Sequence, residues 1–410
     1  MAQEFQRILV VTLFSRITHH VSPIVVCRPS SVVHRPSSRI TTAPMEASND
    51  TLPGWDVRPY RPGDENALAA LFLRVFGKEV TPKWWLWKLK GLTSPVENVW
   101  VAVAQDDERI IGQYTGIPVR LKLGETIRDA MVSVDIMTDP DFRRRGVLTK
   151  MATIVYEAWA AAGVVGVLGL PNEQWGTRTS ALGWVRLFPL RWLRLPLRLD
   201  VMAAGSGKVP GPLLPPAKAV GALGSRILRA RWQRKTWRSA GVSIEEVTSS
   251  ANLPAFDALW AKLSGRYRNM VVRDGEWIKW RYLEAVGNRY RVLLASTSGG
   301  PAGYIAYRVD MAPGRPTGYI ADLFTAPDTQ NVARALLGTM LDDLWRRKVG
   351  SVLATALPGG YLDHLLTAVG FRAMRGAFST EMVPLDPTLD IAALSEKGDW
   401  HLTGGDFDVL

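Results

Sequence analysis

Residues Asp135–Met151 read DIMTDPDFRRRGVLTKM, a stretch that predicts a strand, a basic turn and a helix. The run from Val132 to Met137 favours a strand, and Pro140 ends it because proline cannot donate a ladder hydrogen bond. After Gly146 the apolar residues fall at helical spacing, at Leu148, Met151, Val155, Ala158, Trp159 and Ala162. Three arginines and a glycine are therefore expected at the start of a helix.

This turn has the features of an anion site. The first turn of a helix leaves backbone N–H groups unpaired, and its dipole end is positive. Gly146 would let a ligand come close to the backbone. An ordinary basic surface turn is the alternative interpretation, and this pattern alone does not separate the two.

Length and composition limit the possibilities. With 410 residues, 47% of them apolar, the chain favours two or more packed domains. No apolar run approaches the ~20 residues of a membrane span. Cys27 is the only cysteine, which excludes disulfides and cysteine metal sites, and three of the five histidines precede residue 45. We expect a cytoplasmic protein with no metal and no stable membrane insertion.

The net charge of +12 is unevenly distributed. Residues 1–45 contribute +4 and residues 191–238 contribute +10, so the remainder of the chain is slightly acidic. The basic charge thus belongs to a tail and a connector, and no nucleic-acid partner is expected. The basic stretch Arg226–Arg238 could contact anionic partners or a membrane, or it could be a solvated connecting helix.

The second half of the chain repeats the first. The run Trp84–Lys88 recurs as Trp277–Arg281, and Asp135–Asp141 recurs as Asp322–Asp328. The residues that replace the basic glycine turn are Gln330, Asn331, Val332 and Ala333. The second copy has lost both charge and glycine, so its anion site should be weak or absent, and Ala333→Asp should hardly affect ligand binding.

These patterns divide the chain into five segments. We expect residues 1–50 to be a disordered leader or a mis-called start, with Met45 as the true initiator in the second case. Residues 51–200 would form a ligand-binding domain and residues 201–240 a basic Gly/Pro linker and helix. Residues 241–390 would form a degenerate second domain, followed by a tail over residues 391–410.

The basic turn resembles the signature of the GCN5-related N-acetyltransferase (GNAT) superfamily: Arg or Gln, two residues, Gly, one residue, then Gly or Ala. Arg143 and Gly146 match it, whereas Leu148 replaces the small residue and would narrow the approach to a pyrophosphate. The two copies resemble the tandem acetyltransferases of the enhanced-intracellular-survival type. Over residues 55–385, the resemblance implies a mixed α/β fold with two tandem GNAT-like domains, each a mixed sheet flanked by helices with a strand-helix-strand crossover.

The resemblance also implies acetyl coenzyme A as the acyl donor and an amine, on a small molecule or a peptide, as the acceptor. The pantetheine arm would pair along the strand edge, and the basic turn would bind the pyrophosphate. Asn172 would border the thioester. The residues implied to bind the donor are Ile136, Met137, Thr138, Arg143, Arg144, Arg145, Gly146, Val147, Leu148, Thr149 and Asn172.

The catalytic groups are less well defined by the sequence. Glu173 and Asp135 are candidates for the base that deprotonates the amine, although each could instead be structural, as a helix-start cap or a buried acid. In the resembled enzymes a tyrosine serves as the acid, but the matching position here is Trp175. Tyr114 could donate a proton or only pack. The acidic C-terminus could reach the cleft or fray, so the acid stays unassigned.

Two alternatives to an N-acetyltransferase remain at this point. One is a Fem-type transferase that uses aminoacyl-tRNA, although an arginine-glycine turn is better suited to bind a pyrophosphate. The other is a non-catalytic acyl-CoA-binding or interaction protein, which the missing tyrosine would suit. Under each of these interpretations, including the N-acetyltransferase, the protein could be a homo-oligomer.

Overall fold

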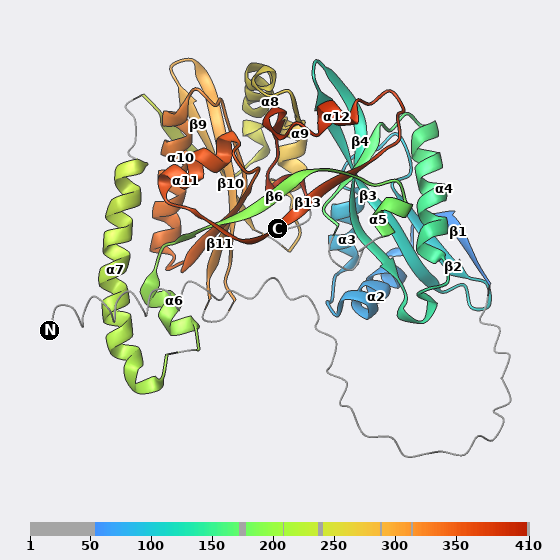
Figure 1. Ribbon diagram of the computed structural model, residues 1–410, viewed down its shortest axis with the longest axis horizontal. Coiled ribbons are helices and arrows are strands. Elements are labelled where there is room, and N and C mark those ends of the chain that lie inside the picture. Colours follow the sequence, from blue (N-terminus) through green and yellow to red (C-terminus); the bar gives the residue numbers. More distant parts are fainter. Residues whose placement is uncertain are drawn as a thin grey trace. The chain divides into compact units, whose positions relative to one another are not determined.

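The computed structural model describes residues 54–171, 178–207, 209–236, 241–287, 289–312 and 315–407. The residues from Trp55 onward form one compact unit. It contains a 14-stranded sheet with both parallel and antiparallel pairs, flanked by helices (Figure 1). The mixed α/β fold class predicted from the sequence is therefore confirmed.

The first half contains the strand, turn and helix predicted around Gly146. Its first helix begins after Asp64, whose carboxylate binds Arg58 and the Arg61 N–H and does not cap the helix. The strands are β1 (Trp55–Pro59), β2 (Val99–Ala104), β3 (Ile110–Leu123), β4 (Thr126–Thr138), β5 (Gly166–Gly169) and β6 (Val185–Pro196), and the helices are α2 (Glu65–Phe76), α3 (Pro82–Lys90), α4 (Val147–Ala161) and α5 (Arg178–Ala181).

The order of elements recurs in the second half. Each half has a strand, two helical segments, three strands, a crossover helix, a strand, a helix and a last strand. In the second half the main strands are β7 (Ser243–Val247), β9 (Tyr290–Thr297), β10 (Gly300–Asp310), β11 (Thr317–Thr325), β12 (Ser351–Ala356) and β13 (Arg372–Pro384), and the helices are α8 (Leu253–Leu263), α9 (Gly275–Ile278), α10 (Gln330–Arg346) and α11 (Tyr361–Val369). Short strands β8 (Asn269–Val271) and β14 (Trp400–His401) are additional.

The two halves exchange their last strands. Strand β13 lies between β5 and β6, and β6 in turn pairs with β12 of the second half (Figure 1). The sequence did not indicate β6, because arginines interrupt its apolar pattern from Arg186 onward. Since each half completes the sheet of the other, the boundaries predicted at residues 200 and 241 do not separate two independent sheets. The domain boundaries themselves stay predictions.

The repeated tryptophan motifs contact each other. The indole N–H of Trp87 donates to the carbonyl of Trp280 at 2.9 Å, and the indole N–H of Trp280 donates to the carbonyl of Trp87 at 2.8 Å. Their rings are stacked with centroids 5.9 Å apart. Such a reciprocal contact is what two equivalent residues form across an approximate two-fold axis.

The connector is largely helical. Helix α6 (Leu199–Gly205) is followed by α7 (Leu214–Lys235), so the Gly/Pro linker predicted to extend to Pro216 ends earlier. Pro215 and Pro216 lie in the first turn of α7, where a missing N–H costs nothing. Among the described residues, no helix is long and apolar enough to cross a membrane.

The last described residues are buried. The 3-10 helix Gly404–Asp406 contacts both β11 and β12, and Asp406 forms a capping box with Thr403. Asp406 also accepts hydrogen bonds from the Arg273 guanidinium at 2.6 and 2.8 Å, and Arg273 binds Asp322 of β11 at 2.9 Å. Residues up to Phe407 are thus anchored, not frayed; residues 408–410 lie outside the described part.

This buried cluster predicts a pH dependence. Burial raises the pKa of the Asp406 carboxyl to about 6, above the ~3.9 of an exposed aspartate. Because the folded-state pKa is the higher one, the contribution of Asp406 to the free energy of unfolding is full below about pH 4 and is lost as the pH rises through about 6. The loss is on the order of 2 kcal/mol.

The test compares urea unfolding of the wild type and Asp406→Asn at pH 4 and pH 7. All other titrating groups are common to both proteins, so the variant should lose less stability over this interval than the wild type. An identical pH dependence in the two proteins would contradict the assignment.

Candidate active site

Strands β4 and β5 separate at their carboxyl ends. They pair in parallel only at Met131 with Val167 and Val132 with Leu168. Strand β4 continues to Thr138, whereas β5 ends at Gly169. Within the described part of the chain, the edge of β4 from residue 134 to 138 that faces β5 has no strand partner, so its backbone groups can pair with an extended ligand.

A bulge in β4 lies at the start of this open edge. The register with β3 shifts between Gln113, which faces Met137, and Thr115, which faces Val134, so β4 holds one extra residue. Asp135 occupies the bulge with φ of +46°. This left-handed conformation is unfavourable for a residue with a side chain, and surrounding contacts must hold it.

Buried side chains from two other elements hold the bulge. The Lys88 ammonium lies 2.5 Å from a carboxylate oxygen of Asp135, and the Gln113 side chain donates to the Asp135 carbonyl at 2.9 Å. Gln113 in turn accepts from the indole N–H of Trp85 at 2.9 Å. Lys88 and Asp135 are 4% and 9% exposed at their side chains, so the pair is shielded from water and salt.

The basic turn follows the open edge directly. Arg144 and Gly146 both have positive φ, +64° and +75°, and α4 begins at Val147. No described residue accepts a hydrogen bond from the N–H groups of residues 144 to 149, and the first intrahelical donor is Lys150. These N–H groups lie at the positive end of the helix dipole, which makes a concave donor surface for an anion.

The side chains around the turn keep positive charge on its surface. Arg143 and Arg144 are exposed, and the Arg145 guanidinium lies 4.8 Å from the ring centroid of Phe142. Asp139 is buried under the turn and is neutralised by Arg74 at 3.0 Å. Leu148 is half-buried and packs against the core that α4 covers.

The predicted catalytic residues meet different outcomes. Glu173, Asn172 and Trp175 lie outside the described residues, so their roles stay predictions. Asp135 is engaged by Lys88, which suits a structural acid better than a free base.

Tyr114 packs in the core. It is fully buried against Tyr156 of α4, with hydroxyls 2.5 Å apart. Burial raises the pKa of Tyr156 to about 12 and that of Tyr114 further, so both phenols keep their protons at neutral pH. This arrangement favours the packing interpretation. His401 is also buried, against Tyr267 and Phe324, whereas His364 is exposed.

The second half fills the equivalent place with its own chain. Strands β11 and β12 pair over residues 317–319 and 351–353, and the segment Gly404–Asp406 lies against both. A Cβ on Gly405 would lie 2.9 Å from the Ala321 carbonyl oxygen, so glycine permits this close approach. Asp322, the counterpart of Asp135, binds Arg273 and Thr403 instead of a lysine.

Position 333 is unsuitable for a control substitution. Ala333 is fully buried inside α10, so an acidic residue there would bury a charge and would not be tolerated. The turn that precedes α10 is also shorter, because α10 begins at Gln330 directly after Thr329. Asn331 is exposed and is the better position for a control substitution.

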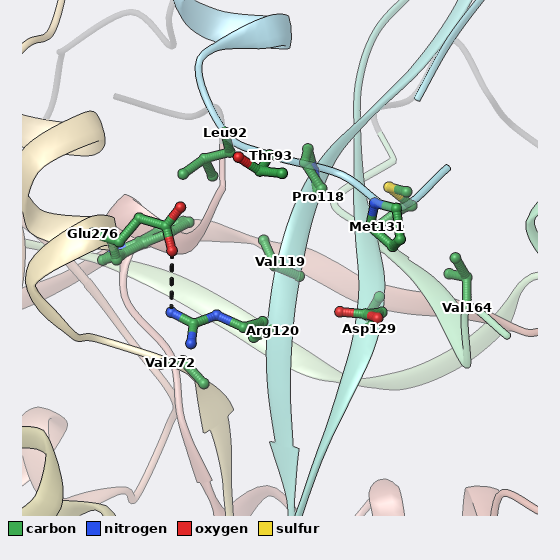
Figure 2. A pocket seen from close by; sticks show the side chains of 13 residues that line it. Leu92, Thr93, Pro118, Val119, Arg120, Asp129, Met131, Val164, Val272 and Glu276 are labelled. Carbon is green, nitrogen blue, oxygen red and sulfur yellow. Dashed lines mark ion pairs between the residues drawn. The ribbon is translucent and has the colours of Figure 1, made fainter. Parts of the chain in front are cut away.

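A separate cavity of about 260 Å³ lies beside the carboxyl half of β3 and the amino half of β4. Its lining includes Pro118 and Val119 of β3, Asp129 and Met131 of β4, and the Arg120–Glu276 ion pair of 3.7 Å (Figure 2). The open edge of β4 begins only beyond Val132, towards its carboxyl end, so this cavity is distinct from the open edge.

Sequence reasoning missed three of these features. Lys88 lies in the tryptophan-rich helix, and only its counterpart Arg281 in the repeat hinted at a conserved charge between the copies. The positive φ of Asp135 has no sequence signal, because aspartate normally avoids it in strands. The docking of Gly404–Asp406 depends on β11 and β12, which are far away in the sequence.

Comparison with known proteins agrees with this geometry. Residues 56–184 match the family model of the acetyltransferase (GNAT) domain. These residues include the open edge, the bulge and the basic turn. No curated protein matches the sequence of the chain.

Several solved structures share the fold. A probable N-acyltransferase of Enterococcus faecalis V583 has a TM-score of 0.57 at 14% identity, over 81% of this chain and 72% of its own. A GCN5-related N-acetyltransferase of Anabaena variabilis ATCC 29413 has a TM-score of 0.57 at 12% identity, over 81% and 73%. A GCN5-related N-acetyltransferase of Kribbella flavida has a TM-score of 0.54 at 14% identity, over 82% of this chain and 72% of its own. The residues from 56 to 184 form a GNAT acetyltransferase domain.

Proposed function

We propose that this protein transfers an acetyl group from acetyl coenzyme A to an amine acceptor by direct attack. The observation that carries the proposal is the open edge of β4, which leads directly into a turn of unpaired N–H groups. An extended amide-containing arm that ends in a pyrophosphate matches both parts. Acetyl coenzyme A has this chemistry.

Each part of the donor would have its own partner. The pantetheine amides would bond the backbone of Ile136, Met137 and Thr138, and the N–H groups from Arg144 to Thr149 would bind the pyrophosphate. Arg143, Arg144 and Arg145 would add charge-assisted contacts, because their side chains are not consumed by ion pairs with described residues. Asn172 would lie beside the thioester.

The reaction needs a neutral amine. An alkylamine has a pKa of about 10 and is mostly protonated at neutral pH, so a base must take a proton before or during attack. The amine nitrogen then bonds to the thioester carbon, the carbon–sulfur bond breaks, and the thiolate takes a proton. We assign the base to Glu173 in preference to Asp135, because Asp135 is held by Lys88.

The second half would bind no donor. Its groove between β11 and β12 holds the chain's own segment Gly404–Asp406, and its turn lacks arginine and glycine. We therefore assign one donor site to each chain, in the first half.

The activity itself is tested by release of free coenzyme A thiol from acetyl coenzyme A in the presence of a panel of small and peptide amines. At least one amine should accelerate release above the rate of hydrolysis. Donor binding without accelerated release for any amine would overturn the transferase and leave a binding protein.

Donor binding is tested at Gly146, where φ is positive and a Cβ would meet no described atom within 4 Å. Gly146→Asp should weaken binding of coenzyme A by more than tenfold, about 1.4 kcal/mol, because it places a carboxylate at the pyrophosphate. Gly146→Asn has nearly the same size and tolerates this backbone, so it should lose much less.

Titration calorimetry measures both variants and also gives a wild-type stoichiometry of one. Asn331→Asp in the second half is the matched control and should bind as the wild type does. Equal losses in Gly146→Asp and Gly146→Asn would show that shape, not charge, is at work.

The two candidate bases give different results when each carboxylate becomes an amide. Glu173→Gln should lower kcat about 100-fold at neutral pH with donor affinity unchanged, and raising the pH should partly restore the rate. Asp135→Asn should instead lower the melting temperature and weaken donor binding, because it disturbs the bulge. Normal stability with lost turnover in Asp135→Asn would reverse the assignment.

A further inference from the structure

We propose that helix α7 and the basic cavity beside it form a docking surface for an anionic phospholipid bilayer. This role is independent of the acyl transfer proposed above. It rests on an exposed apolar stripe, on uncompensated positive charge, and on a cavity that fits a phosphate headgroup.

The apolar stripe lies on the outer side of α7. Leu213, Val220, Leu223 and Ile227 are 58, 46, 61 and 63% exposed. They follow one another at spacings of seven, three and four residues, which places them on one face of a helix. The buried residues Gly221, Ser225 and Trp232 hold the opposite face to the rest of the protein. Large apolar side chains in such a row mark a contact surface.

Positive charge borders the stripe without compensation. Helix α7 contains six basic residues and no acidic one. Lys218, Arg226, Arg231 and Arg234 form no ion pair with any residue in the described part of the chain. At 100° per residue, Arg226 and Arg231 lie on the two flanks of the stripe. A basic helix with an apolar face lies well in the headgroup region of an anionic membrane.

A cavity of about 640 Å³ opens on one flank. Arg198, Arg226, Arg229 and Gln233 line it together with Trp345. The guanidinium groups of Arg198 and Arg229 lie 4.9 and 5.1 Å from the Trp345 ring centroid.

The donors of this cavity are only partly used. Arg198 is paired with Asp200, and Arg229 with Asp342 at 3.2 Å, but the Nε atom of Arg229 is buried without a partner and Arg226 has no ion pair among the described residues. Guanidinium groups are well suited to phosphate oxygens. A lipid phosphate in the cavity would place its acyl chains beside Leu223 and Ile227.

The charge argues for a membrane over a second copy of the chain. A second α7 on the stripe would bring six further cations and no anion, whereas an anionic bilayer supplies the missing countercharge. Four large apolar side chains also expose far less than the roughly 800 Å² that each partner of a stable protein interface buries.

The test is co-sedimentation of the full chain with phosphatidylcholine vesicles, with and without phosphatidylglycerol. The wild type should sediment with the anionic vesicles only and should be released by high salt. Arg226→Gln/Arg231→Gln should weaken binding about fivefold for each charge. Leu223→Ser/Ile227→Ser should weaken it about tenfold or more.

A charge-matched control is Arg372→Gln/Arg375→Gln, which removes two exposed cations on β13 and should bind as the wild type does. All variants should keep the wild-type melting temperature, because these side chains are exposed. Unchanged binding in the Leu223/Ile227 variant, or equal binding to neutral vesicles, would overturn the proposal. A dimer in sedimentation velocity that this variant abolishes would overturn it in favour of self-association.

Discussion

The buried ion pair between Lys88 and Asp135 is the contact on which the open edge of β4 depends. It stabilises an aspartate in a left-handed conformation that costs of the order of 1 to 3 kcal/mol by itself. That conformation makes the bulge, and the bulge lies in the stretch of β4 beyond its last pair with β5 at Val132. An ion pair is an effective device here because both groups are shielded, and removing either one would leave a buried charge.

The second half shows what happens when the same position has other partners. Asp322 corresponds to Asp135, but it binds Arg273, which also binds Asp406 of the C-terminal segment. The lysine's counterpart, Arg281, donates to the carbonyl groups of Gly405 and Phe407. The polar groups that could have served a ligand are thus satisfied within the chain. The loss of the arginine-glycine turn and the docking of this internal segment both leave fewer free polar groups for a ligand in the second half.

The sequence predicted what depends on short spacings. The strand, turn and helix around Gly146 follow from local periodicity and from proline and glycine chemistry, and the repeat follows from direct comparison of the two halves. It could not predict β6, since Arg186, Arg191 and Arg194 interrupt its apolar pattern, nor the exchange of β6 and β13, since strand partners are set by tertiary packing. Within the candidate site, the strand and the basic turn were predictable, but the support of Asp135 by Lys88 and Gln113 was not. That support joins three separate elements, α3, β3 and β4.

The exchange of strands gives the second half a structural role in the sheet of the first half. Strand β13 pairs with β5 from Glu381 to Pro384, opposite residues Gly166–Gly169. It therefore covers the side of β5 that faces away from β4. Without it, β5 would be a four-residue edge strand, with an unpaired row of backbone groups on that side. A ligand or another chain could then pair with that side of β5. The second half thus supplies the strand that leaves one open edge in the first half, and its own groove can be closed by the C-terminal segment without loss to that role.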